Sequence, residues 1–183
     1  MFGNKQHNDF DQLPLLARQS GFDLLSDEPV IMGSRPISST LIRKALQEGD
    51  IESTTAMLGC HYGISGTVVT GRQVGRKLGF ATANLQPEDH RKALPLEGVY
   101  AVKAFWGNNS AIGMANLGPQ PTFGSPVSVF EIHLLDLQAD LYGETLKVEF
   151  LSRLRDTKKF NSPEALIDQL KLDEQKTRDL TAR

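Results

Sequence analysis

The sequence predicts a mainly β domain, either an antiparallel barrel or a sandwich, that follows a short α/β segment and ends in one helix. From Tyr62 onward, apolar and polar residues alternate in short segments that Gly and Pro interrupt, a pattern typical of antiparallel strands. Before Tyr62, and again after Ser162, the apolar residues follow a helical period instead. The chain has 183 residues, which suits one medium domain with an appendage.

Composition narrows the class of protein. Hydrophobic residues make up 39% of the chain and charged residues 23%, which is ordinary for a globular protein with one core. The net charge of −2 gives no global positive field, so we expect neither a nucleic-acid nor a membrane partner. The sequence shows neither an apolar run of about 20 residues nor a signal-peptide core. A single cysteine, Cys60, excludes an internal disulfide, and these features together predict a cytoplasmic protein.

The N-terminal segment shows the weakest pattern of secondary structure. Residues 11–18 contain three leucines that fit the start of a short helix despite Pro14. Residues 21–32 fit a strand that ends near a turn at residues 33–36, where Gly and Pro occur together.

Two short capped helices are expected next. The segment ISSTLIRKALQEGD predicts a helix with Ser38 or Ser39 as its N-cap and Gly49 at its end. Asp50 is expected to cap a second helix that ends at Gly59.

The alternating segments that follow each predict a strand: residues 62–71, 98–106, 110–118, 127–136 and 145–154. Residues 107–109 form a hairpin signal between the second and third of them. Ser162 and Pro163 then predict the start of a helix. Its apolar stripe is expected to lie against the barrel and consists of Leu166, Ile167, Leu170 and Leu172.

The stretch GRQVGRKLGFATAN, residues 71–84, combines three glycines, three cationic residues and a Thr-x-Asn pair. Such glycines let backbone N–H groups approach an anion. In an extended segment, Thr82 and Asn84 would point the same way and offer two oxygen ligands, which suits a hard cation such as Mg²⁺. The stretch matches neither the Walker loop nor the dinucleotide fingerprint. From residue types alone, it fits either a phosphate site or a solvated hairpin connection.

The predicted strand over residues 127–136 contains a carboxylate, Glu131, that is a candidate for catalysis. Phe130, Ile132 and Leu134 share one face of this strand, while Glu131 and His133 share the other. Glu131 fits either a solvent-facing position or a base that accepts the proton of a hydroxyl during phosphoryl transfer. His133 fits a strand residue in a supporting position beside such a site.

Motifs from about Ile37 to the C-terminus occur in a recognisable order: GRKLGF with TAN, EGVYAV, NLGPQPTF, FEIHLLD and DLYG. They resemble bacterial riboflavin kinase, and more closely the C-terminal kinase half of the bifunctional riboflavin kinase/FMN adenylyltransferase, also called FAD synthetase. The resemblance implies a six-stranded Greek-key barrel with a C-terminal helix. It also implies the ATP- and Mg²⁺-dependent phosphorylation of riboflavin at its ribityl 5′-hydroxyl, which gives FMN and ADP.

The resemblance also implies site residues. Glu131 matches the catalytic base, and Thr82 and Asn84 match the metal- and phosphate-binding pair. The nucleotide loop is matched by Gly75, Lys77, Gly79 and Phe80. The segments that meet the flavin are matched by Arg155, Phe160 and Asp173. For Arg155 and Asp173, the alternative is an ordinary surface charge.

Residues 1–58 resemble the end of the family's adenylyltransferase half, and residues 59–183 its kinase half. A phosphate-binding motif of the first half is matched by Ser38, Ser39, Thr40 and Arg43, with an ordinary capped helix as the alternative. The His-x-Gly-His-type motif near the start of that half does not occur in this sequence. We therefore expect riboflavin phosphorylation without adenylylation of FMN.

Two other functions stay open at this stage. Ala81 stands where the resembling family has proline, so a flavin- or nucleotide-binding module with little turnover is one alternative. A barrel that binds single-stranded nucleic acid is the other, but the net charge of −2 and an aromatic content of 7% disfavour it.

Overall fold

The computed structural model describes residues 13–25, 27–70, 80–119, 128–137 and 139–182. The chain forms two compact units, Met1–Ile37 and Ser38–Arg183. The predicted boundary between the family halves at residues 58 and 59 stays a prediction.

The described residues of the first unit form one helix and one small hairpin. Helix α1 spans Leu13–Ser20, which confirms the predicted short helix. Strands β1, Ile31–Met32, and β2, Arg35–Pro36, pair around a turn in which Gly33 has φ 64°. The predicted strand over residues 21–32 was therefore too long. A strand extends only as far as its backbone finds a partner, and the described pairing of β1 stops after two residues.

Two capped helices begin the second unit. Helix α2, Ser39–Glu48, has Ser38 as its N-cap, with Oγ accepting a hydrogen bond from Leu41 N at 3.3 Å. Helix α3, Ile51–Leu58, has Asp50 as its N-cap. Gly49 and Gly59 end the two helices in the left-handed conformation. The predicted caps are thus confirmed at both ends of both helices.

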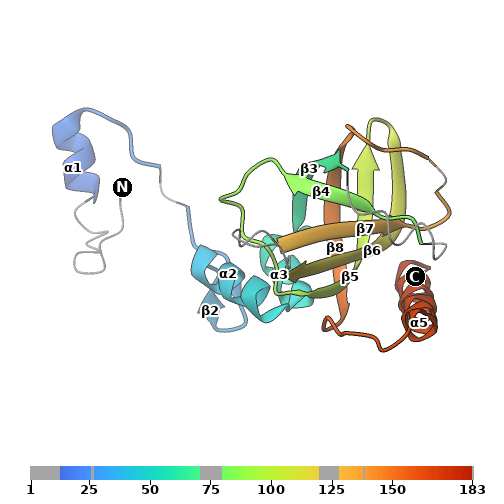
Figure 1. The fold of residues 1–183 in the computed structure, drawn as a ribbon. Helices are drawn as coiled ribbons and strands as arrows, with labels where there is room; N and C mark the ends of the chain where they lie inside the picture. Colours follow the sequence, from blue (N-terminus) through green and yellow to red (C-terminus); the bar gives the residue numbers. More distant parts are fainter. Residues whose placement is uncertain (1–12, 26, 71–79, 120–127, 138, 183) are drawn as a thin grey trace. The chain divides into compact units, whose positions relative to one another are not determined.

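Six strands close into an antiparallel barrel in the order β3-β4-β7-β6-β5-β8 (Figure 1). The strands are β3 Gly63–Val69, β4 Ala83–Pro87, β5 Gly98–Trp106, β6 Asn109–Pro119, β7 Ser128–Leu134 and β8 Thr145–Arg155. This architecture confirms the expected barrel and its strand number. Five strands occupy the segments that alternation predicted, and β4 forms at the extended Thr-x-Asn segment.

Side chains fill the barrel interior, as in other small barrels. Tyr100, Phe130 and Phe150 meet there, with ring centroids 5.3 and 5.8 Å from that of Phe150. Leu46 of α2 and Ile51 of α3 are fully buried in the same cluster, so both helices pack against the barrel. Because side chains fill the interior, the strands have only their outer faces to offer to a ligand.

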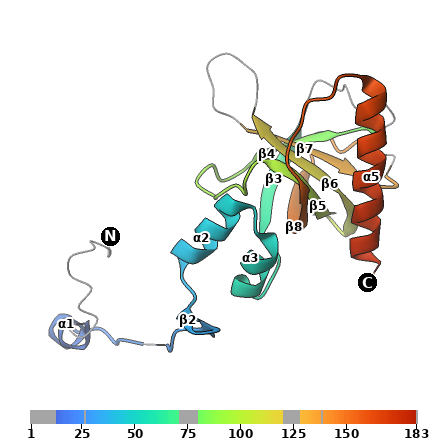
Figure 2. The ribbon, with the colours of Figure 1, turned by 90° about the horizontal axis from the view of Figure 1, so that it is seen from below.

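Helix α5, Pro163–Thr181, runs alongside the barrel and contacts β6 and β8 (Figures 1 and 2). Ser162 is its N-cap, as predicted. The predicted apolar stripe was wrong for Leu172, whose exposed fraction is 59%. The residues that α5 buries completely are polar, Asp173 and Thr177. Leu166, Ile167 and Leu170 are half-buried. Hydropathy alone failed at Leu172 and did not predict the burial of Asp173, because a charged side chain can be buried when it has an ionic partner. No helix in the described part of the chain is long and apolar enough to cross a membrane.

Candidate functional site

Three polar side chains lie side by side on the outer surface of the barrel. Asn84 on β4 is opposite Glu131 on β7, and Glu131 is in turn opposite Asn116 on β6. Directly paired residues on neighbouring antiparallel strands project from the same face. Phe130 and Ile132 are buried in the core, so Glu131 faces outward. All three polar side chains are half-buried. We call Asn84, Glu131 and Asn116 the polar row.

Sequence analysis identified two members of the polar row but did not assign a role to Asn116. The prediction of a strand over residues 110–118 did not show which face Asn116 takes, because the apolar Ile112 and Met114 share its side of the strand. It could not show which residue of β7 lies opposite, because that depends on the register between two strands. Thr82, which directly precedes β4, is also half-buried.

His133 follows Glu131 on the same face of β7 and connects this strand to the segment before β4. Its Nδ1 lies 2.8 Å from the main-chain oxygen of Ala81. Because a carbonyl oxygen only accepts hydrogen bonds, Nδ1 carries the proton. The Phe80 ring packs edge-on against the imidazole, with centroids 5.1 Å apart and an interplanar angle of 62°. The residues that lead to Thr82 are thus in direct contact with β7.

The predicted nucleotide loop is only partly within the described chain. Gly75, Lys77 and Gly79 lie outside the described residues, so their role stays a prediction. Phe80 is described, and its half-buried ring contacts His133. Its predicted contact with nucleotide also stays a prediction.

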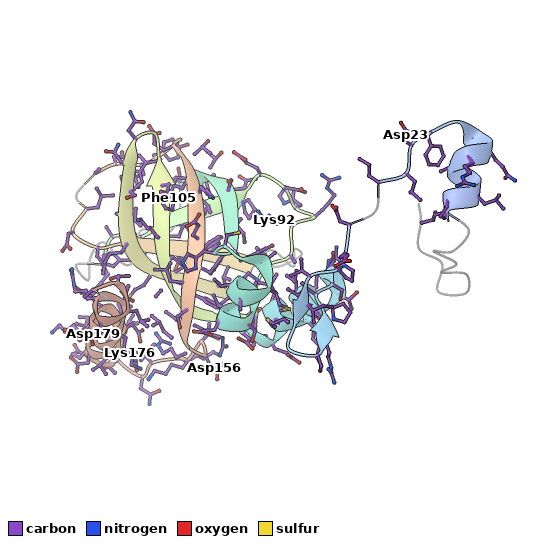
Figure 3. The ribbon with its side chains drawn as sticks, turned by 180° about the vertical axis from the view of Figure 1, so that it is seen from behind. Asp23, Lys92, Phe105, Asp156, Lys176 and Asp179 are labelled. Carbon is purple, nitrogen blue, oxygen red and sulfur yellow. The ribbon has the colours of Figure 1, made fainter. Side chains whose placement is uncertain are left out.

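The structure brings the three predicted flavin-side residues together where β8 leads to α5. Arg155 Nε donates to Asp173 Oδ2 at 2.8 Å, and Nη2 lies 2.7 Å from the same oxygen. Arg155 Nη1 donates to the main-chain oxygen of Asp156 at 2.9 Å. Asp156 lies just after β8 (Figure 3). The Phe160 ring centroid is 5.8 Å from Arg155 Cζ and 5.0 Å from Lys158 Nζ.

These residues are not ordinary surface charges. The Asp173 side chain is 0% exposed and that of Arg155 is 17% exposed. Gln169 Nε2 donates to Asp173 Oδ1 at 2.9 Å, so both carboxylate oxygens have partners. The alternative that we considered for Arg155 and Asp173 was therefore wrong, while their contact with flavin stays a prediction.

A second ion pair holds the other end of α5. Arg178 donates from Nη1 and Nη2 to the two oxygens of Asp136, each at 2.8 Å, and also donates to Glu174. Asp136 follows β7 and has a positive φ of 58°. The hydrogen bond from Arg178 holds the pKa of Asp136 below its usual value. Helix α5 is thus attached by charge to the end of β8 and to the residues after β7.

The predicted phosphate motif of the first half lies at the start of α2. Ser38, Ser39, Thr40 and Arg43 are all exposed. The Ser38 hydroxyl acts as a helix cap, as the alternative proposed, and a phosphate role for these residues stays a prediction.

The donor chemistry around the polar row fits a hard cation. In the described part of the chain, no group of three or more His, Cys, Asp or Glu side chains could hold a metal ion. Thr82, Asn84 and Glu131 instead offer hydroxyl, amide and carboxylate oxygens. Mg²⁺ takes few protein ligands and completes its shell with water and substrate phosphate, so a small oxygen donor set is compatible with it.

The described residues thus form a small closed antiparallel barrel with a carboxylate between two amides on its outer face. The family model described as Flavokinase, riboflavin kinase, matches residues 58–181. The chain therefore belongs to the riboflavin kinase family.

Its relatives include longer proteins. The bifunctional riboflavin kinase/FMN adenylyltransferase of Escherichia coli K12 is 37% identical over 183 residues, which is 100% of this chain and 56% of that protein. The protein of the same name from Haemophilus influenzae is 35% identical over 173 residues, 94% of this chain and 56% of that protein. The chain thus spans about half the length of these curated relatives.

A solved structure is similar as well. It is described as a macrolide-efflux protein from Streptococcus pneumoniae, and it is 37% identical with a TM-score of 0.81. The match covers 89% of this chain and 53% of that one.

Proposed function

We propose that this chain transfers the γ-phosphoryl group of ATP to the ribityl 5′-hydroxyl of riboflavin, giving FMN and ADP. The observation that carries the proposal is the register of β4, β7 and β6, which aligns Asn84, Glu131 and Asn116 on one face. Membership of the riboflavin kinase family supports the choice of substrate. The proposal concerns this chain, whereas the relatives are about twice as long.

We assign Glu131 as the residue that accepts the hydroxyl proton. The ribityl oxygen bonds to the γ-phosphorus as the bond to the β,γ-bridging oxygen breaks, and the hydroxyl proton passes to the Glu131 carboxylate. A strand residue suits this role because β7 is paired on both sides, with β4 and β6, which fixes the Glu131 backbone. Asn84 and Asn116 lie on either side and offer amide groups to a polar substrate.

Thr82 and Asn84 are the residues that would hold Mg²⁺ together with the phosphates of ATP. Both offer neutral oxygens, so the negative charge that the ion requires would come from the nucleotide. A bound Mg²⁺ would neutralise charge on the transferring phosphoryl group. The chain's own contribution is to present the two side chains beside Glu131.

The flavin side of the site is assigned to the region where β8 leads to α5. Arg155 and Asp173 bind each other, so they act there by holding α5 against β8. The Phe160 ring lies near two cationic side chains, those of Arg155 and Lys158, at the same place, and an aromatic ring suits contact with a planar ring system.

Chromatography of a reaction with riboflavin, ATP and Mg²⁺ tests the function. We expect FMN to accumulate and no FAD to form. If riboflavin fluorescence shows binding but FMN does not appear, the chain is a flavin-binding module. If FAD forms, the expectation that FMN adenylylation is absent is wrong.

A further inference from the structure

We propose that His133 is a positioning residue for the phosphoryl-transfer site. Its Nδ1–H fixes the peptide that presents Thr82 and Asn84 beside Glu131. The inference rests on the proposed function, because it assigns His133 to the organisation of that same site. His133 itself is assigned no contact with substrate.

The first step concerns the group that His133 holds. The Ala81 carbonyl, 2.8 Å from Nδ1, belongs to the planar peptide unit that also contains the N–H of Thr82. Fixing this oxygen fixes the direction in which the chain enters Thr82. The described pairing of β4 with β7 begins one residue later, at Ala83 opposite Ile132. The hydrogen bond from His133 therefore acts just where the strand ladder has not yet begun.

The second step concerns the rigidity of His133. Gly113 on β6 approaches so closely that a Cβ there would lie 2.3 Å from the main-chain oxygen of His133. Met114, the residue opposite His133, is 4% exposed although it lies on the outer face. The Gly113 contact restricts the His133 main chain, and the edge contact with Phe80 restricts its imidazole. A donor held in this way imposes its position on the Ala81 peptide.

A pair of substitutions separates positioning from general packing. The amide nitrogen of His133→Asn can take the place of Nδ1, whereas that of the longer His133→Gln reaches the place of Nε2. We expect His133→Gln to raise the KM for Mg-ATP about three- to tenfold, the effect of one hydrogen bond, with the KM for riboflavin nearly unchanged. His133→Asn should keep a KM for Mg-ATP close to that of the wild type.

Hydrogen exchange gives a readout that does not need turnover. In the free protein, the segment 80–84 should exchange faster in His133→Gln than in the wild type, and His133→Asn should restore slow exchange. If the wild type made no FMN, the proposed function would fail, yet this comparison would still decide the role of His133. Equal behaviour of the two variants, or unchanged exchange and KM in His133→Gln, would overturn the proposal.

Discussion

The same family resemblance marked Asn84 and Glu131 of the polar row and the Arg155–Asp173 ion pair, but the carboxylates of the two regions have different surroundings. In the polar row, Glu131 is half-buried between two amides on an outer barrel face. In the ion pair, the Asp173 carboxylate is 0% exposed and is bonded by Arg155 and Gln169. Residues assigned to one site can therefore serve chemistry in one case and helix attachment in the other. Substitution of Glu131 should therefore lower the reaction rate, whereas substitution of Asp173 should lower the free energy of unfolding.

The largest expected effect is on rate, at Glu131. Glu131→Gln removes the proton acceptor but keeps the size of the side chain. It should lower kcat by about two to four orders of magnitude, the usual range for loss of a general base, with little change in melting temperature. Glu149→Gln on β8 is the matched control and should keep the wild-type rate. A Glu131→Gln variant with a near-normal rate would remove this residue from the mechanism.

The next effect is on stability, at Asp173. Asp173→Asn leaves the largely buried Arg155 guanidinium without its counter-ion, and loss of one partner of a buried pair costs about 3–5 kcal/mol. Urea unfolding should therefore show a large loss of unfolding free energy. Glu174→Gln is the control, at a half-buried position of the same helix that pairs with the partly exposed Arg178, and it should change stability much less. If Asp173→Asn were as stable as the wild type, the ion pair would not hold α5.

A smaller effect is expected at the proposed cation ligands. Thr82→Ala and Asn84→Ala should each raise the KM for Mg-ATP about tenfold, as expected for the loss of one charge-assisted contact, and should change the KM for riboflavin less. Gln86→Ala, the next outward position on β4 and an exposed one, is the control. An equal rise in both KM values, together with a lower melting temperature, would assign Thr82 and Asn84 a structural role.

Local sequence patterns predicted much of the fold, and the features that they missed depend on contacts between distant segments of the chain. Alternation located the strands, and cap chemistry at Asp50 and Ser162 located helix starts, because both depend on neighbours in the sequence. The place of Asn116 beside Glu131 was not predictable, since it depends on the register of two strands. Burial of Asp173 in place of Leu172 was missed for a similar reason, because its partner Arg155 is on another element. The side chains that matter most to the site are those whose neighbours come from other strands.

The smallest expected effect lies at the exposed ion pair of α5 and depends on pH. The hydrogen bond from Arg178 lowers the pKa of Asp136 below its ordinary value of 3.8. A carboxyl with a depressed pKa in the folded state stabilises the protein above its unfolded pKa, and this contribution is lost as pH falls through the folded value. Asn tolerates the positive φ of residue 136, so Asp136→Asn removes charge without backbone strain. At pH 7 this variant should be slightly less stable than the wild type in urea unfolding, because the Asp136 side chain is 72% exposed. As the pH falls from 3.8 through the lower pKa of the folded state, the two curves should converge, because protonated Asp136 is as neutral as Asn. A difference that stayed constant across this range would mean that Asp136 acts through its backbone conformation and not through its charge.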